Sequence, residues 1–258
     1  MLDTEGFTKD NIVIQVYKTR GDLGVTAARD VSHRITSLLE SGKEQVNIIF
    51  AAAPSQNEFL EALIQEQVDW SKVNAFHMDE YIGLDSNAPQ GFANFLRQKI
   101  FDQVDCRHVY YLDGNAADNA QEIERYTALL KQYPADIVCM GIGENTHIAF
   151  NDPHVAKFED PQLVKVVDLD IASRMQQVND GCFATIDEVP THALTLTIPA
   201  LLNAKYIYCI VPSALKAQAI YHTIHEPISE AYPSTILRKH KQAKLYLDQA
   251  SAKLLNND

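Results

Sequence analysis

The alternation of two hydrophobic patterns constrains the fold of this chain most strongly. Residues 46–51, VNIIFA, are apolar almost throughout, as in a strand that is buried on both faces of a parallel sheet. Between residues 23 and 39, by contrast, apolar side chains recur every three or four positions, which predicts an amphipathic helix. A chain that alternates these patterns forms right-handed strand–helix–strand units and a mostly parallel sheet with helices on both faces.

The same two patterns recur along most of the chain. Strands are expected at 12–17, 46–51, 73–78, 109–112, 137–140, 164–169, 193–197, 206–211 and 245–247. Helices are expected at 23–39, after Ser55, and at 91–101, 118–133 and 214–224. Ser55 and Glu58 form an S-x-x-E capping box, so we expect them to start the second helix. Because no linker or repeat interrupts the pattern, the sequence predicts an α/β fold: one doubly wound, Rossmann-like domain over residues 1–258.

Charge and cysteine usage exclude several classes of function. The formal net charge of −12 argues against a nucleic-acid-binding protein, which would need a basic face. Cys106, Cys139, Cys182 and Cys209 form no C-x-x-C pair, so neither a zinc site nor a disulfide framework is expected. The acidic residues 1–5 lack a hydrophobic signal core, and no apolar run approaches the length of a membrane span. We therefore expect a cytoplasmic protein that interacts with neither nucleic acid nor membrane.

Three polar clusters stand where predicted strands end. They occupy residues 53–55, Asp79–Glu80 and residues 145–152. In sheets of this kind, ligands bind at the carboxyl ends of the strands. We therefore expect the three clusters to meet in a single active site.

The third cluster belongs to the densest motif of the chain, GIGENTHIAFNDP at residues 141–153. Glycines at a strand end let the backbone approach a ligand closely. His147, with Asp152 five residues later, could act as a tuned acid or base near neutral pH. The alternative is a tight turn that the histidine merely caps. The density of special residues favours a site.

Asp79 and Glu80 lie where a strand gives way to a loop. Adjacent residues of an extended chain point to opposite sides, so we expect only one of the two to face a cleft. Partial burial would disfavour its charged form, which suits a proton shuttle between neighbouring carbons. The sequence is equally compatible with an alternative in which one carboxylate caps the loop and the other is solvated.

Other motifs bear on ligands and cofactors. Lys216 lies at the start of a predicted helix, where a cation and free N–H groups could hold a phosphate, although a surface lysine is the more frequent explanation. Gly141-x-Gly143 is a weak phosphate signal, because the full dinucleotide fingerprint and the P-loop lysine are missing. There is no Gly-x-Ser-x-Gly elbow and no H-E-x-x-H spacing. We therefore expect no nucleophilic serine, no metal and no nucleotide cofactor.

Five segments carry specific motifs in a specific order. They are 76–84 (FHMDEYIGL), 141–153, 190–197 (PTHALTLT), 201–204 (LLNA) and the pair Lys216-Ala217. Together they resemble the glucosamine-6-phosphate deaminase (isomerase) family, and the resemblance extends over nearly the whole chain. The related 6-phosphogluconolactonases share the sheet and the Gly-x-Gly…His turn, but the M-D-E-Y and H-I-A-F-N stretches are similar to the deaminase branch.

The resemblance implies an activity on a small sugar phosphate. In the family reaction the sugar ring opens, a proton moves between C1 and C2, and ammonia is released to leave a ketose phosphate, without a redox cofactor. By resemblance, Asp79 transfers the proton, and His147 opens the ring with Asp152 tuning it. Lys216 corresponds to a phosphate ligand. The candidates are Asp79, Glu80, Asn145, His147 and Asp152 for catalysis, and Ala53, Pro54, Ser55, Gly143, Thr146, Arg174 and Lys216 for substrate binding.

The chain departs from the family at several of these positions. Asn145-Thr146 replaces the Asp-Gly that normally precedes the histidine, and asparagine can orient His147 by a hydrogen bond but carries no charge. Asp152 stands where the family has Glu. Residues 51–57 replace a glycine-rich phosphate turn. The arginine expected in a mobile lid is missing, and Arg174 lies nearby in a different register.

These departures leave two alternatives open beside the deaminase. One is a 6-phosphogluconolactonase-like hydrolase, or an isomerase of a different sugar. The other is a sugar-phosphate-binding regulator that has lost catalysis. Residues 154–157, HVAK, replace those that form an allosteric site in some members, so an allosteric hexamer is not expected, and a homo-oligomer of another kind is left open.

Overall fold

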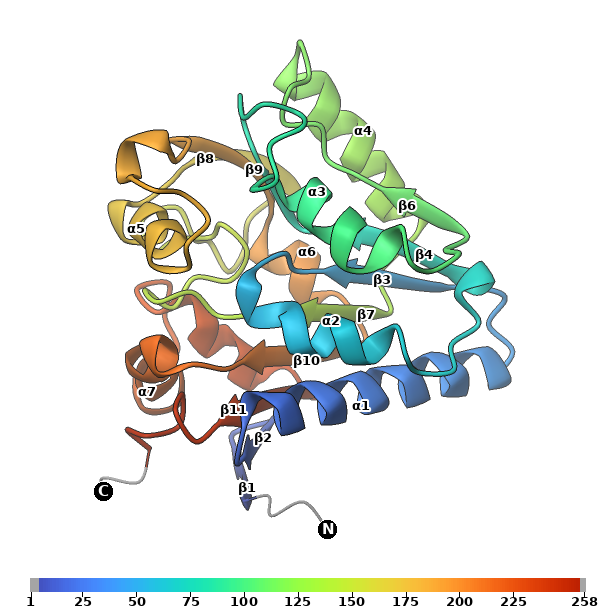
Figure 1. Ribbon diagram of the computed structural model, residues 1–258, viewed down its shortest axis with the longest axis vertical. Coiled ribbons are helices and arrows are strands. Elements are labelled where there is room, and N and C mark those ends of the chain that lie inside the picture. The colour runs from blue at the N-terminus through green and yellow to red at the C-terminus, as the bar shows by residue number, and fades with distance from the viewer. Residues whose placement is uncertain (1–4, 256–258) are drawn as a thin grey trace.

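The computed structural model describes residues 5–255, and one large sheet runs through the centre of the fold (Figure 1). Its eight strands have the order β1-β2-β11-β10-β7-β3-β4-β6. Every neighbouring pair is parallel except β1 with β2. The strands are β1 (Glu5–Lys9), β2 (Ile12–Tyr17), β3 (Val46–Phe50), β4 (Val73–His77), β6 (His108–Tyr110), β7 (Ile137–Met140), β10 (Tyr206–Val211) and β11 (Ala243–Asp248). The predicted α/β fold with a mostly parallel sheet is confirmed.

Helices cover both faces of this sheet (Figure 1). One face packs against α1 (Arg20–Glu40), α2 (Asn57–Leu63) and α3 (Phe92–Leu96), and the other against α4 (Asn119–Gln132), α6 (Ile198–Leu202) and α7 (Ala217–His225). Neighbouring residues of β3 serve the two cores: Ile48 and Phe50 lie in the first, and Ile49 lies in the second. The apolar run at residues 46–51 is therefore buried on both sides, as its composition indicates.

A second sheet of three antiparallel strands was not expected. It contains β5 (Asp79–Tyr81), β9 (His192–Leu196) and β8 (Val164–Asp168), in that order. The strands predicted at 164–169 and 193–197 are thus present, but outside the parallel sheet. Only Met78 separates β4 from β5, so the chain passes directly from the large sheet into the small one. Asp79 and Glu80 consequently lie on a strand rather than in a loop.

Several local expectations differ from the structure. β1, α5 (Ile171–Asn179) and α6 were not expected. The proposed capping box is wrong, because Ser55 lies inside a 3₁₀ turn, Pro54–Gln56, and no side chain caps α2. Glu58 is instead held by Arg20, whose Nη2 donates to its Oε2 at 2.8 Å.

Two expectations concern the whole chain. Within residues 5–255, no helix is both long and apolar enough to span a membrane. The absence of a signal core was expected for residues 1–5, and residues 1–4 lie outside the part of the chain that the structure describes.

Candidate active site

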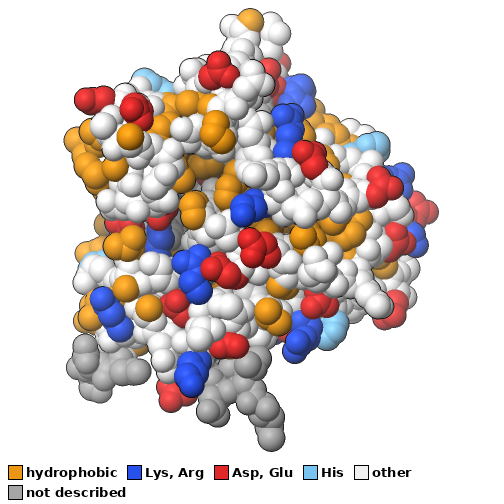
Figure 2. Space-filling view, in the orientation of Figure 1, with side chains coloured by type: hydrophobic (Ala, Val, Ile, Leu, Met, Phe, Trp, Pro, Cys, Tyr) orange, Lys and Arg blue, Asp and Glu red, His pale blue; other side chains and the backbone are white. Residues whose placement is uncertain are grey.

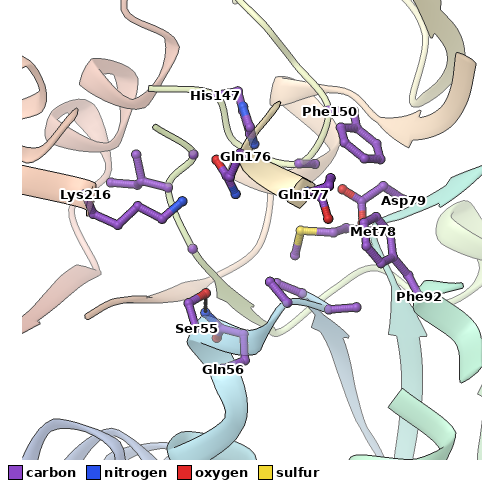
Figure 3. A pocket seen from close by; sticks show the side chains of 17 residues that line it. Ser55, Gln56, Met78, Asp79, Phe92, His147, Phe150, Gln176, Gln177 and Lys216 are labelled. Carbon is purple, nitrogen blue, oxygen red and sulfur yellow. Dashed lines mark hydrogen bonds between the residues drawn. The ribbon is translucent and has the colours of Figure 1, made fainter. Parts of the chain in front are cut away.

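A cleft with an empty volume of about 480 Å³ lies at the carboxyl ends of the parallel strands. The surface is hollowed there, between α5 on one side and α2 and α3 on the other (Figure 2). The loops after β3, β4, β7 and β10 bring side chains to it, and α5 adds two glutamines (Figure 3). Its lining includes Ala53, Ser55, Gln56, Met78, Asp79, Phe92, Gly143, His147, Phe150, Gln176, Gln177 and Lys216. The prediction that the three strand-end clusters meet in one place is confirmed.

His147 is held on one edge of its ring by three oxygen atoms. Its Nδ1 lies 2.7 Å from Asn145 Oδ1, 2.7 Å from Ser173 Oγ and 3.1 Å from Asp152 Oδ1. Asn145 Nδ2 donates to Asp152 at 2.9 Å, so the Asn145 oxygen is the atom that faces the ring and can only accept. Nδ1 therefore carries a proton. Nε2 is left as the ring nitrogen available to a ligand in the cleft.

Gly143 is required by the position of this ring. A Cβ at residue 143 would lie 2.1 Å from His147 Cε1, so any side chain would displace the imidazole. The expected close approach at this glycine is thus made by His147. Thr146 and Ala149 take positive φ values of 72° and 47°, which are strained for residues other than glycine. The turn holds its shape around His147 at a conformational cost.

Asp152 is fully buried yet remains charged. Burial opposes ionisation, but hydrogen bonds from His147, Ser173 and Asn145, and the charge of His147 when its ring is protonated, outweigh it. The pKa of the Asp152 carboxyl therefore lies below its usual value. Its second oxygen accepts from the backbone N–H of Asp170 at 3.1 Å. Asp152 does not line the cleft, and it acts on a ligand only through His147.

Asp79 and Glu80 point to opposite sides, as the alternation of a strand predicts. Asp79 lines the cleft and is 7 % exposed. Burial, and secondarily the charge of Glu80, raises the pKa of Asp79 well above its usual value. Glu80 faces away and accepts from the backbone N–H groups of Phe92 at 3.1 Å and Ala93 at 2.8 Å, at the start of α3. Glu80 therefore has a structural position, and only Asp79 faces the cleft.

Lys216 is a buried lysine rather than a surface one. It is 4 % exposed, ends the 3₁₀ turn Ala214–Lys216 before α7, and points into the cleft (Figure 3). Burial lowers the pKa of Lys216, although the charges of Asp180 and Glu144 oppose this effect. Among residues 5–255 no hydrogen bond or ion pair holds its Nζ. A buried cation without a partner is costly, and an anionic ligand would supply the missing partner.

The remaining predicted substrate-binding residues fall into two groups. Ala53 and Ser55 line the cleft. Pro54, Thr146 and Arg174 do not. The Arg174 guanidinium instead donates to the backbone carbonyls of Ile186 and Val189 at 2.6 and 2.9 Å. These contacts tie α5 to the turn that follows it and correct the expectation that Arg174 reaches the substrate.

Sequence reasoning missed the residues that α5 contributes. Ser173, Gln176 and Gln177 are all buried, and both glutamines line the cleft. Gln176 Oε1 accepts from the backbone N–H of Glu144 at 2.8 Å. Their spacing of three and four residues places them on one side of a helix. This spacing was the available signal, but polar residues at helical spacing ordinarily indicate a solvated face.

No group of three or more His, Cys, Asp or Glu side chains within residues 5–255 is arranged to hold a metal ion. The chemistry available in the cleft therefore comes from Asp79, His147 and Lys216. These groups can move a proton, act as acid and base, and neutralise an anion.

Comparison with known proteins gives a consistent family. The family model of glucosamine-6-phosphate isomerases/6-phosphogluconolactonase matches residues 18–247. A glucosamine-6-phosphate deaminase of Exiguobacterium sibiricum is 33 % identical over 215 residues, covering 83 % of this chain and 83 % of the relative. A glucosamine-6-phosphate deaminase of Streptococcus sanguinis is 32 % identical over 207 residues, covering 80 % of this chain and 86 % of the relative.

Solved structures agree with this result. A monomeric glucosamine-6-phosphate deaminase matches with a TM-score of 0.86 at 27 % identity, covering 93 % of this chain and 99 % of that one. A 6-phosphogluconolactonase from Thermotoga maritima shares the fold, with a TM-score of 0.72 at 18 % identity over 91 % of this chain and 98 % of the other. The chain therefore belongs to the glucosamine-6-phosphate isomerase/6-phosphogluconolactonase family.

Proposed function

We propose that this protein is an amino-sugar phosphate deaminase/isomerase, which converts glucosamine 6-phosphate or a close relative to a ketose phosphate and ammonia. One observation carries the proposal: a carboxylate with a raised pKa, an imidazole and a lysine without a partner in the described part of the chain line a single cleft. The named relatives act as deaminases on such a substrate. Ammonia release is therefore the expected activity.

Lys216 is the proposed phosphate ligand. Its side chain is buried, its ammonium has no hydrogen-bond or ion-pair partner among residues 5–255, and it lies at the start of α7, whose dipole also favours an anion. Residues 51–57, which carry no glycine, offer a phosphate fewer close backbone contacts. Lys216 would accordingly contribute a large share of the affinity for phosphate.

His147 is the proposed ring-opening group. Because Nδ1 carries a proton toward Asn145 and Ser173, the neutral ring has its lone pair on Nε2. Nε2 can take the proton of the C1 hydroxyl and return it to the ring oxygen as the C1–O5 bond breaks. Asp152 stabilises the imidazolium that forms between these two steps.

Asp79 is the proposed proton shuttle. After ring opening, its carboxylate takes the C2 proton and delivers it to C1, while a proton of the C2 amino group passes to O1 through solvent, which leaves an imine at C2 and a hydroxyl at C1. Water then adds to the imine, and ammonia leaves the ketose phosphate. A raised pKa strengthens the carboxylate as a base and makes the protonated form available for the return step. Lactone hydrolysis needs no proton transfer between carbons, so it would give Asp79 no such role.

The proposal also covers the cellular compartment, the domain organisation and the partners of the enzyme. We place it in the cytoplasm, where its four unpaired cysteines would stay reduced. We propose that residues 1–258 form one catalytic domain. A net charge of −12 gives no basis for a nucleic-acid partner.

The test is an ammonia assay on the purified protein with glucosamine 6-phosphate and galactosamine 6-phosphate, with the ketose phosphate quantified in parallel. Equal amounts of both products support the proposal. Hydrolysis of 6-phosphogluconolactone without ammonia would instead identify a lactonase. Calorimetric binding of glucosamine 6-phosphate without any product would identify a regulator.

A further inference from the structure

One side of α5 is polar and buried, which reverses the pattern of an ordinary surface helix. Ser173, Gln176 and Gln177 face inward, whereas Ile171 and Met175 are 70 % and 41 % exposed. Buried polar side chains are retained where each has a partner or a ligand. The inner side of α5 is thus built for the cleft rather than for a hydrophobic core.

Ser173 connects α5 to the His147 ring and to the Asp152 carboxylate behind it. Its Oγ lies 2.7 Å from His147 Nδ1 and donates to Asp152 Oδ1. An ionised carboxylate can only accept, so the hydroxyl proton points to Asp152 and an oxygen lone pair is left for the Nδ1–H of His147. Ser173 is 1 % exposed, so water does not compete for these contacts.

A second contact fixes α5 to the same turn. Gln176 Oε1 accepts from the backbone N–H of Glu144 at 2.8 Å. Ser173 and Gln176 are almost one helical turn apart, so the helix is held against residues 144–152 at two points. The position of α5 and the geometry of His147 are therefore linked.

We infer that Ser173 is a positioning residue of the reaction, which holds the His147 ring and the Asp152 carboxylate in register when α5 is seated on the turn. This inference rests on the proposed function of His147. Ser173 contacts no reacting atom, because Asp152 and Nδ1 both lie on the inner side of the ring. Its loss should therefore slow the chemical step while leaving substrate affinity nearly unchanged.

The test compares Ser173→Ala with Ser32→Ala, a substitution of another buried helical serine, which lies on α1. With glucosamine 6-phosphate, Ser173→Ala is expected to lower kcat about tenfold and to change KM by less than about twofold. Ser32→Ala should leave both constants unchanged. A kcat for Ser173→Ala equal to that of Ser32→Ala, or a loss confined to KM, overturns the inference.

A second measurement keeps this inference separate from the proposed function. Carboxyl ¹³C NMR of Asp152 reports its titration without any substrate. Ser173→Ala removes a hydrogen bond that favours the ionised form, so the midpoint should move upward from its depressed position. If the wild-type protein releases no ammonia, the proposed function fails, but this titration still tests whether Ser173 holds the Asp152 carboxylate. An unchanged midpoint in Ser173→Ala overturns the inference about Ser173.

Discussion

Two buried aspartates, Asp79 in the wall of the cleft and Asp152 behind His147, occupy opposite electrostatic settings. Asp79 lies on the regular strand β5, and its carboxyl has no hydrogen-bond partner among the residues that the structure describes. Asp152 lies in an irregular turn and accepts hydrogen bonds from Asn145, Ser173 and the backbone of Asp170. The pKa of Asp79 is raised and that of Asp152 is lowered. Burial alone therefore does not set the pKa of these two carboxyl groups; the hydrogen bonds and the imidazole around Asp152 reverse its effect there.

This difference separates two roles in the proposed reaction. A carboxyl group without donors can change its protonation state during catalysis, because no hydrogen bond holds its charged form. A carboxylate that several donors hold remains charged and can stabilise a neighbouring imidazolium. Regular backbone suits the first role, because a strand delivers one side chain to the cleft. The second role requires a turn that converges several side chains on one ring.

The largest expected effect is the loss of turnover in Asp79→Asn. Removing the proton shuttle should lower kcat at least about 10³-fold, while the fold remains intact because asparagine is of nearly the same size. The measurement is steady-state ammonia release together with thermal unfolding. Glu80→Gln is the matched control, since Glu80 faces away from the cleft, and it should keep kcat within a few-fold. Similar activity losses in both variants would contradict the assignment of the two carboxylates.

His147→Gln tests the turn that carries His147 and Asp152. Glutamine cannot cycle a proton, so turnover of glucosamine 6-phosphate should fall about 10²-fold. A 5-deoxy analogue, which cannot close the pyranose ring, should be slowed much less. The ratio of the two rates in variant and wild type is the measurement. Equal slowing of both substrates would remove ring opening from the role of His147.

The pH dependence of stability should have opposite signs for the two aspartates. Because the folded pKa of Asp79 is raised, the folded state binds its proton more tightly than the unfolded chain, whose aspartates titrate near about 3.9. Stability then falls as pH rises through the folded pKa. Asp79→Asn removes this fall, so the stability of the variant relative to the wild type should rise between pH 4 and pH 8.

Asp152→Asn should behave in the reverse way. A lowered pKa contributes stability that is present above the unfolded value and is lost as pH falls toward the folded value. The variant should therefore be least stable relative to wild type near neutrality, and the difference should shrink below about pH 4. Urea unfolding from pH 3 to pH 8 measures both variants. If the stability difference from the wild type changed with pH in the same direction for both variants, the opposite settings of the two aspartates would be contradicted.

The two regions were not equally predictable from the sequence. The large sheet follows from continuous apolar runs such as residues 46–51, and the inward direction of one carboxylate of the pair Asp79–Glu80 follows from strand alternation. β5 was missed as a separate strand because only Met78 divides it from β4. Ser173 and Gln176 were missed because their partners lie about thirty residues away, and no local pattern encodes such a contact.

The smallest expected effect concerns the strain in the turn that holds His147. Thr146 has a φ of 72°, and its buried Oγ1 has no hydrogen-bond partner among residues 5–255. A left-handed conformation costs about 1–2 kcal/mol for a residue with a Cβ, and a buried unpaired hydroxyl costs about 1–3 kcal/mol. Glycine removes both terms but adds about 0.5–1 kcal/mol of chain entropy to the unfolded state. Loss of the buried threonine methyl group offsets part of the remaining gain. Thr146→Gly should therefore raise the free energy of unfolding by only about 1 kcal/mol, measured by urea denaturation.

Ala149→Gly separates the two contributions, since Ala149 shares the positive φ but has no hydroxyl group. Its gain should be smaller than that of Thr146→Gly, because only strain is relieved and the entropy term opposes it. Activity gives a second measurement. If the strain in the turn holds the His147 ring in place, Thr146→Gly should gain stability and lose up to about a few-fold in kcat. A loss of stability in Thr146→Gly would show that the turn is not strained at this residue. The difference between β5, which carries Asp79, and the turn that carries His147 and Asp152 would then consist only in their side-chain hydrogen bonds.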